Sequence, residues 1–368
     1  MESGAIPALR TRLLAWYRHN QRDLPWRRSH DPYAIWVSEI MLQQTRVAVV
    51  VERYRDFLAR FPTVVSLSLA SEEEVLALWS GLGYYRRARM LLKAAQFVAH
   101  HCQGSFPASA AALRALPGIG PYTAAAIASI AHGEPVAVVD GNVERVICRM
   151  AGWEAGSRKG GGAALRRKVE ALAAELVDPS RPGDWNQAMM ELGAVVCLPR
   201  NPRCATCPAQ RDCVTRGEHK TTPRGPMLSR ESAYALSVRS ARKRAGIPMR
   251  GMKNREVLLE QRPKTASVMP GMWELPTLRD SAVPESELRM AVRHSIMRVN
   301  YYVRIRTVFE ADVGKLALRG GRRRWVTPNV AGTMALTGLA RKVLLRARLL
   351  PARALHMIAP ARRNAGAD

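Results

Sequence analysis

The first 215 or so residues repeat apolar positions at the three- and four-residue spacing of amphipathic helices, with proline or glycine between segments. One segment opens with Asp31 and Pro32, a capping residue followed by proline at the first helical position, and we expect a helix from there to residue 61. Another segment carries four apolar residues on one face: Val143, Val146, Ile147 and Met150. The pattern predicts a helical domain over residues 1–215.

The period changes in the second part of the chain. Residues 216–230 are polar, basic and interrupted by proline and glycine, which favours an exposed linker. Beyond it, alternating or apolar runs predict strands, and a helical pattern closes the domain: strands at 234–240, 255–262 and 300–313, helix at 335–350. We therefore expect an α+β domain over 231–350, followed by a basic tail at 351–368.

The net charge of the chain indicates which class of partner it binds. The chain has 57 Lys and Arg against 30 Asp and Glu, a formal net charge of +27. Such a surface attracts polyanions and gains affinity by releasing their counterions, so nucleic acid is the expected partner. A GC-rich genome that favours arginine is the alternative explanation of the excess.

The location follows from what the sequence lacks. No cationic and apolar leader opens the chain, and no apolar run reaches the roughly 18 residues of a membrane span. We expect a cytoplasmic, nucleoid-associated protein without a membrane partner.

Four of the six cysteines lie close together. Six, two and five residues separate them in order: Cys197, Cys204, Cys207 and Cys213. In a reducing compartment, clustered cysteines bind metals more often than they form disulfides. The spacing by itself allows either a zinc site with four thiolates or an iron-sulfur cluster.

A glycine-containing turn lies upstream of the cysteines, between two helical segments. In the run LPGIGP, Gly118 and Gly120 permit a tight turn with close backbone approach, and Pro121 suits the start of the next helix. The N–H groups at that helix start can receive a phosphate. An ordinary loop turn fits the same residues, but the arrangement resembles a helix-hairpin-helix motif.

Two carboxylic acids stand out. Asp140 lies between an apolar extended stretch and a predicted helix, where the helix N-terminus favours a negative charge, although a simple helix cap has the same pattern. Glu39 lies between Val37 and Ile40 on an apolar helix. Burial there would raise its pKa and leave a proton donor near neutrality, whereas a solvent-facing position would not.

These features together resemble the endonuclease III superfamily of DNA base-excision glycosylases. The resemblance rests on three motifs: the cysteine spacing after WNQAMMELGAVVC, the hairpin LPGIG and the segment VDGNV. The resemblance implies that Asp140 is catalytic and that the cysteines bind a structural [4Fe-4S] cluster. It also implies that Arg200 and Arg203, between the first two cysteines, face DNA phosphates.

The run SEIMLQQT resembles the signature of the MutY-type adenine DNA glycosylases, and the resemblance makes Glu39 the general acid. Tyr122 occupies the hairpin position at which the endonuclease III branch has a nucleophilic lysine. A phenol cannot form an imine, so we expect no strand-cleaving lyase step through this residue. Tyr122 and Asn142 are expected to orient Asp140 and the attacking water.

The resemblance implies further contacts with DNA. Gln44 and Tyr84 would wedge into the duplex, Thr45 and Leu82 would lie near the partner base, and Trp26 with Arg27 would form the adenine pocket. Leu82 and Tyr84 also fit an alternative role as core residues.

The second domain resembles the Nudix-like domain with which MutY-type enzymes recognise 8-oxoguanine, through residues 262–278 and 323–344. Residues 274–292 lack a glutamate-rich metal-binding box, which argues against pyrophosphohydrolase activity. The family's usual Phe-Ser-His lesion-reading loop is replaced by Ile296-Met297-Arg298. Either Arg298 or Ser295 takes over that role, or discrimination of 8-oxoguanine is weaker.

The expected function is that of a monomeric, monofunctional glycosylase that removes adenine paired with 8-oxoguanine or guanine in double-stranded DNA. Glu39 would protonate adenine N7, and Asp140 would stabilise the cationic sugar. Two alternatives are an endonuclease III-like glycosylase and lyase for oxidised pyrimidines, and a noncatalytic iron-sulfur DNA-binding protein.

Overall fold

The structure is a computed structural model, which describes residues 4–154, 162–219, 225–240, 255–281, 283–296, 298–317 and 321–350. The chain forms two compact units, Met1–Leu69 with Met90–Arg224, and Ala70–Arg89 with Gly225–Asp368. The division at residue 225 falls inside the predicted linker, and the segment 70–89 groups with the later part of the chain. The basic tail at 351–368 lies outside the described residues.

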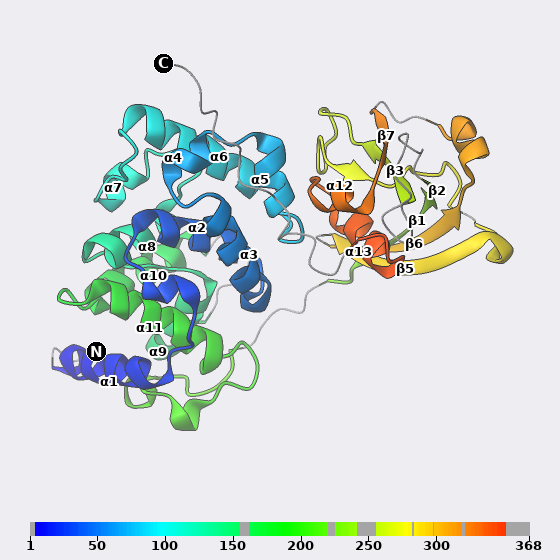
Figure 1. Ribbon diagram of the computed structural model, residues 1–368. Coiled ribbons are helices and arrows are strands. Elements are labelled where there is room, and N and C mark those ends of the chain that lie inside the picture. The colour runs from blue at the N-terminus through cyan, green and yellow to red at the C-terminus, as the bar shows by residue number, and fades with distance from the viewer. Residues whose placement is uncertain are drawn as a thin grey trace, which may run out of the picture. The chain divides into compact units, whose positions relative to one another are not determined.

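Helices make up the first unit (Figure 1). In chain order the helices are α1 (Ala5–Asn20), α2 (Pro32–Leu42), α3 (Val47–Arg60), α4 (Val64–Ser68), α6 (Arg86–His101), α7 (Ala110–Leu113), α8 (Pro121–His132), α9 (Gly141–Ala151), α10 (Gly162–Leu176) and α11 (Pro182–Val195). Short 3-10 turns are η1 (Pro25–Arg28), η2 (Cys204–Thr206) and η3 (Gln210–Asp212). In the described residues, no helix is long and apolar enough to cross a membrane.

The predicted apolar stripe of α9 is confirmed. Its four members, Val143, Val146, Ile147 and Met150, are buried in one core with residues of α1, α10 and α11. Because this core fixes α9 along its length, it also fixes the residue that caps the start of the helix.

The predicted continuous helix over residues 32–61 is wrong. Its start is as expected, since the Asp31 side chain accepts a hydrogen bond from the Tyr33 amide and Pro32 is the first helical residue. However, α2 ends at Leu42 and α3 begins at Val47. Between them Gln44 has a φ of 57°, which no α-helix accommodates. Apolar residues continue on both sides of this short turn, so periodicity does not reveal it.

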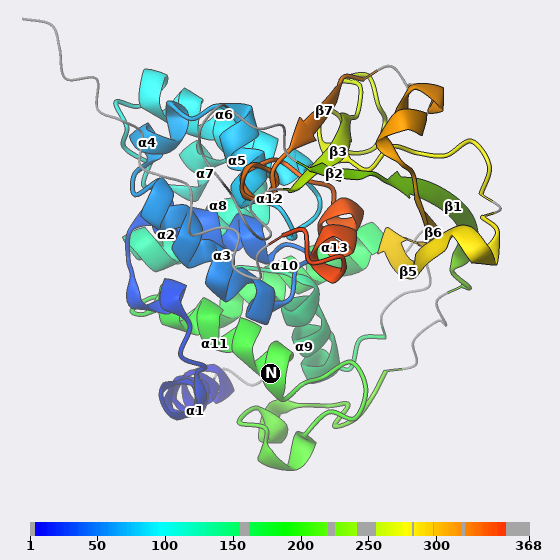
Figure 2. The same ribbon diagram turned by 45° about the vertical axis from the view of Figure 1, so that its right-hand side comes forward.

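The second unit contains a three-stranded and a four-stranded sheet (Figure 2). The strands are β1 (Leu228–Leu236), β2 (Val238–Ser240), β3 (Arg255–Gln261), β4 (Trp273–Glu274), β5 (Leu288–Ile296), β6 (Val299–Thr307) and β7 (Arg323–Val326). One sheet has the order β1-β6-β5, with β1 parallel and β5 antiparallel to β6. The other has the order β2-β3-β4, with β7 also paired to β3. The helices are α5 (Glu72–Leu78), α12 (Pro328–Gly332) and α13 (Gly338–Arg346), with 3-10 turns η5 (Glu285–Glu287) and η6 (Glu310–Lys315).

The strands differ from the sequence prediction in several places, and the segment predicted as one strand over 234–240 is divided between β1 and β2. β1 begins at Leu228, inside the predicted linker, and the strand predicted over 300–313 ends at Thr307, before the turn η6. β4, β5 and β7 were not predicted, although the more buried residues of β5 alternate with exposed ones. The closing helix is confirmed in a shorter form, because Leu339, Val343 and Leu344 of α13 pack against the sheet core.

Candidate active site

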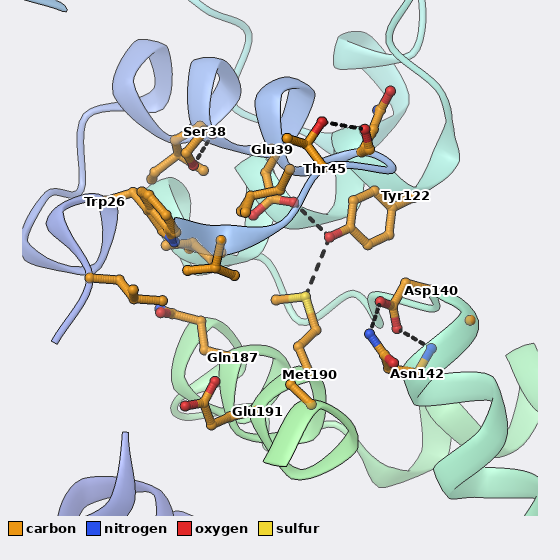
Figure 3. Close-up of a pocket in the computed structure, with 18 of the residues that line it drawn as sticks. Trp26, Ser38, Glu39, Thr45, Tyr122, Asp140, Asn142, Gln187, Met190 and Glu191 are labelled. Carbon is orange, nitrogen blue, oxygen red and sulfur yellow. Dashed lines mark hydrogen bonds between the residues drawn. The ribbon is translucent and has the colours of Figure 1, made fainter. Parts of the chain in front are cut away.

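A cavity of about 690 Å³ opens in the first unit between η1, α2, α8, α9 and α11. It brings together eight residues that the sequence singled out: Trp26, Arg27, Glu39, Gln44, Thr45, Tyr122, Asp140 and Asn142. Figure 3 shows how the labelled side chains from these separate segments face one space. Segments more than 100 residues apart in sequence therefore line one site.

Glu39 forms the buried wall of the cavity on α2. Its residue is 5% exposed, and Oε2 accepts a hydrogen bond of 2.6 Å from the Tyr122 hydroxyl. Burial raises the pKa of Glu39 to about 7, against the lowering effects of the Tyr122 hydrogen bond and of Arg27, and with a further rise from Asp140. At neutral pH this carboxyl group is therefore protonated in a substantial fraction of the molecules.

Tyr122 lies at the start of α8 and connects two walls of the cavity. Besides its bond to Glu39, its hydroxyl is 3.4 Å from the Met190 sulfur on α11 (Figure 3). Burial and the neighbouring Glu39 raise the pKa of Tyr122 well above its ordinary value. The phenol thus remains a hydrogen-bond donor throughout the neutral range.

Asp140 caps α9. Its Oδ1 accepts hydrogen bonds from the backbone amides of Asn142 (2.9 Å) and Val143 (2.7 Å). Its Oδ2 accepts one from the Asn142 side-chain amide, also at 2.9 Å. Both carboxylate oxygens are therefore held by donors from the first turn of the helix, so the predicted cap geometry is present.

The Asn142 side chain is held in turn by Arg145. The Arg145 guanidinium donates to Asn142 Oδ1 (2.9 Å), to the Gly193 carbonyl (2.7 Å) and to the Cys197 carbonyl (2.9 Å). Gly193 lets α11 approach closely, because a Cβ there would lie 2.7 Å from the Asn142 Cβ. Hydrogen bonds thus run from Asp140 to the first residue of the cysteine loop.

Asn186 holds the extended stretch before Asp140, and the sequence interpretation missed it. Its Oδ1 accepts from the Val138 amide at 3.0 Å, and its side-chain nitrogen donates to the Val136 carbonyl (2.8 Å) and the Ser129 hydroxyl (2.9 Å). Asn186 is 2% exposed. The only signal in the sequence was a polar residue within the helical run WNQAMMELG.

Glu191 was also missed. It is fully buried on α11, and its carboxylate accepts from Arg22 at 2.7 and 2.8 Å and from Arg27 at 2.7 Å. Burial raises the pKa of Glu191, but the hydrogen bonds from Arg22 and Arg27 outweigh it and bring the pKa to about 2. The cavity therefore has a permanently charged acid with two guanidinium partners at one side.

Three further cavity residues that the sequence singled out differ in how far they are exposed to solvent. Trp26 is 8% exposed and meets the Tyr54 ring edge-on at 5.5 Å. Gln44 is exposed, and Thr45 is half-buried, with its amide bonded to the Leu42 carbonyl at 3.1 Å.

The hairpin glycines have different surroundings. Gly118 has a φ of 75°, and a Cβ there would lie 3.0 Å from the Met90 Cβ, so both backbone and packing require glycine. Gly120 caps α8 at a φ of −87°, and a Cβ there would meet nothing within 4 Å. Pro121 is the first residue of α8, as predicted.

The four clustered cysteines surround one small cavity of about 20 Å³, which Arg149 also lines. None of them forms a disulfide. Burial, together with the other three thiols, raises the pKa of Cys207 to about 11 against a backbone hydrogen bond from Ala209. In the described residues, no group of three or more His, Cys, Asp or Glu is spaced to hold a single metal ion. Four thiols from one loop around one cavity are nevertheless a donor set that fits a metal cluster.

Four other residues predicted to contact DNA do not line the main cavity. Tyr84 is 48% exposed and Leu82 is 4% exposed, both within the segment 70–89. Arg200 and Arg203 are exposed on the cysteine loop.

The positions that the sequence predicts to read the lesion lie between β5 and β6. Ile296 ends β5, Met297 lies outside the described residues, and the exposed Arg298 donates to the Gly225 carbonyl at 3.0 Å. The Ser295 hydroxyl donates to Asn300 Oδ1 at 2.7 Å.

Comparison with known proteins defines the class first. Residues 37–175 match the family model of the HhH-GPD superfamily of base excision DNA repair proteins. A solved structure of a thermostable thymine-DNA glycosylase is similar in fold, with a TM-score of 0.50, 29% identity, and coverage of 56% of this chain and 94% of that one. The helical unit is thus a helix-hairpin-helix glycosylase fold.

Closer relatives define the family within that class. The chain is 47% identical to a human adenine DNA glycosylase over 220 residues, which cover 57% of this chain and 40% of the relative. It is 34% identical to the Schizosaccharomyces pombe adenine DNA glycosylase over 325 residues, which cover 74% of this chain and 70% of the relative. The chain belongs to the adenine DNA glycosylase family. It spans less than half the length of the mammalian relatives it matches.

Proposed function

We propose that this protein is a monomeric, monofunctional glycosylase that hydrolyses the bond between adenine and deoxyribose in duplex DNA, where adenine is paired with 8-oxoguanine or guanine. One observation carries the proposal: two carboxyl groups in unlike surroundings line one cavity, a buried Glu39 with a pKa of about 7 and a helix-capping Asp140. Membership of the adenine DNA glycosylase family supports it.

The two carboxyl groups divide the chemistry. Neutral adenine is a poor leaving group, so Glu39 donates a proton to N7 as the glycosidic bond breaks. Asp140 faces the sugar, where positive charge develops, and stabilises it electrostatically until water adds. Tyr122 keeps the Glu39 carboxyl in place through its 2.6 Å hydrogen bond, and Asn142 does the same for Asp140 at 2.9 Å.

Adenine must leave the base stack before Glu39 reaches it, at a cost of a few kcal/mol. In this proposal Gln44 and Tyr84 fill the space in the duplex, with Thr45 beside the partner base. Leu82, at 4% exposed, fits the alternative core role instead. Gln44 (φ 57°) and Tyr84 (φ 48°) are two of the seven described non-glycine residues with positive φ, and both side chains are exposed. Backbone strain of this kind collects at functional sites, which supports the wedge roles.

The hairpin at Gly118 and Gly120 would anchor a DNA phosphate on the N-terminus of α8. No neighbour crowds a Cβ at Gly120, so packing within the protein gives no reason for glycine there. Close approach of a phosphate would supply that reason. Exposed Arg200 and Arg203 would add contacts that do not depend on base sequence.

The cysteine loop would hold a [4Fe-4S] cluster through Cys197, Cys204, Cys207 and Cys213. When bound, the cluster links the loop covalently and presents its arginines. Arg149 already organises the loop, because its guanidinium donates to the Leu198 carbonyl at 2.6 Å and to the Cys197 sulfur at 3.4 Å. Four irons per chain in anaerobically prepared protein are expected, and stoichiometric zinc would contradict the cluster.

The second unit would be the Nudix-like domain that recognises the base opposite adenine. Similarity to plant and yeast adenine DNA glycosylases extends over 83% and 74% of the chain, which supports a shared second region. Arg298 or Ser295, at the turn from β5 to β6, would contact 8-oxoguanine in place of the usual serine.

Single-turnover release of adenine from matched duplexes tests this function. With 8-oxoguanine, guanine or cytosine opposite adenine, we expect release in the first two and little in the third. Borohydride trapping on abasic DNA examines the lyase alternative. Efficient trapping, or release of oxidised pyrimidines without release of adenine, would overturn the proposal.

A further inference from the structure

The turn between α5 and α6 presents Tyr84 on an unusual backbone. Gly81, Gly83 and Tyr84 have φ angles of 98°, 69° and 48°, so three of four consecutive residues have left-handed values. Glycine adopts such angles freely, whereas tyrosine does so at a cost in free energy. Something in the fold must hold Tyr84 in this conformation while the residue stays 48% exposed.

Arg87 contacts the turn from the first turn of α6. Its Nη2 donates to the Leu82 carbonyl and to the Gly83 carbonyl, both at 3.1 Å. Its backbone amide donates to the Tyr84 carbonyl at 2.9 Å. One side chain and one amide therefore bind the carbonyl groups of three consecutive residues.

The same guanidinium lies over two aromatic rings. Its central carbon is 5.5 Å from the centre of the Trp79 ring and 5.6 Å from the centre of the Tyr84 ring. Trp79 is fully buried, and its indole N–H donates to the Gly83 carbonyl at 3.2 Å. The chain of contacts runs from the core through Trp79 and Arg87 to the exposed ring.

Burial lowers the pKa of Arg87 to about 10, so the guanidinium is still charged at neutral pH. A planar cation that binds two carbonyl groups and stacks on rings has no equivalent in lysine, whose ammonium group is compact. The geometry is therefore specific to arginine.

We propose that Arg87 is a positioning residue that holds Tyr84 in the conformation that enters the DNA duplex. This inference rests on the wedge role of Tyr84 in the proposed function. Because folding orders the ring and turn in advance, less conformational entropy is lost when DNA binds and adenine leaves the stack.

A double-mutant cycle tests the proposal. The variants are Arg87→Met, Tyr84→Ala and the pair, with Arg87→Lys as the conservative change. Binding is measured on a duplex with a tetrahydrofuran abasic site, and base extrusion by the fluorescence of 2-aminopurine in place of adenine. We expect Arg87→Met to weaken both about tenfold when Tyr84 is present, and less than about twofold when Tyr84→Ala has already removed the ring, as for side chains in direct contact. Arg87→Lys should restore little.

Arg86→Met is the matched control, because it removes a positive charge from an exposed neighbour. Its effect should be the same with or without Tyr84→Ala. Thermal unfolding of every variant separates loss of fold from loss of positioning, and Arg87→Lys serves if Arg87→Met does not fold. Equal effects of Arg87→Met with and without the Tyr84 ring, or full rescue by lysine, would overturn the inference. If the wild type releases no adenine from any mispair, the proposed function fails while the binding cycle still reports on Arg87.

Discussion

The two carboxyl groups of the cavity are held by opposite means. Glu39 lies inside α2 among apolar side chains, and its contact through Oε2 is the Tyr122 hydroxyl. Asp140 lies at a helix start and accepts hydrogen bonds from two backbone amides and one side-chain amide. The apolar surroundings of α2 exclude water from Glu39, whereas the start of α9 surrounds Asp140 with hydrogen-bond donors.

This difference shows how one protein can use the same functional group twice. Desolvation favours the neutral carboxyl group, which can donate a proton near pH 7. Donors aimed at both oxygens of Asp140 hold its carboxyl group in one orientation at the cavity wall. Substitutions in the two regions should have separate effects, and we expect the largest effect at the helix start.

Asp140→Asn should reduce adenine release at least about 10⁴-fold, the scale of losing one member of a catalytic group, while binding to abasic DNA persists. Asparagine is an equally good helix cap, so stability should change little. Asp178→Asn is the control, because Asp178 accepts from the Ser180 and Arg181 amides in the same pattern outside the cavity. Similar single-turnover rates for the two variants would reduce Asp140 to a cap.

Glu39→Gln should slow adenine release by about 10²- to 10⁴-fold, because the amide keeps the shape but donates no acidic proton. The wild-type rate should also fall as pH rises above about 7, where the carboxyl group loses its proton. Single-turnover rates across pH check both points. A variant that retains both the rate and the alkaline fall would show that another group is the acid.

The same substitution should stabilise the fold at alkaline pH. The folded pKa of Glu39, about 7, exceeds the unfolded value of 4.5, so its stability contribution is full below pH 4.5 and is lost as pH rises through 7. The difference is about 3 kcal/mol. Glu39→Gln should therefore unfold at a higher temperature than wild type at pH 8, with a smaller gap at pH 4.5. Glu134→Gln, outside the cavity, is the control substitution.

Tyr122→Phe should give the smallest effect, a shift of the alkaline limb of the rate profile to higher pH. The phenol hydrogen bond lowers the pKa of Glu39, so its loss leaves the acid protonated over a wider range. Tyr33→Phe removes another buried phenol, one bonded to the Phe61 carbonyl, and should leave the limb in place. A shift to lower pH would contradict the assigned direction of the hydrogen bond.

Local features were readable from the chain alone. The Asp31 cap, the proline that opens α8 and the apolar stripe of α9 depend on residues within one or two turns, and all three are present. The family was likewise readable, because motif spacing is a property of the sequence, and the relatives agree with it.

Features that depend on contacts between distant parts of the chain could not be predicted from the sequence. The turn at Gln44 interrupts a helical pattern without altering its period, and β5 became a strand through its pairing with β6. Asn186 and Glu191 take their roles from partners about 50 and 165 residues away in sequence, so no spacing rule could identify them.

By itself the sequence determined which groups are available: an acid on an apolar helix, an acid at a helix start, a tyrosine where a lyase needs lysine, and four spaced thiols. Tertiary structure alone decided that Glu39 is buried beside Tyr122 and that Asp140 lines the same cavity. The physical reason is that a pKa depends on water excluded by surrounding helices, and those helices come from distant parts of the chain.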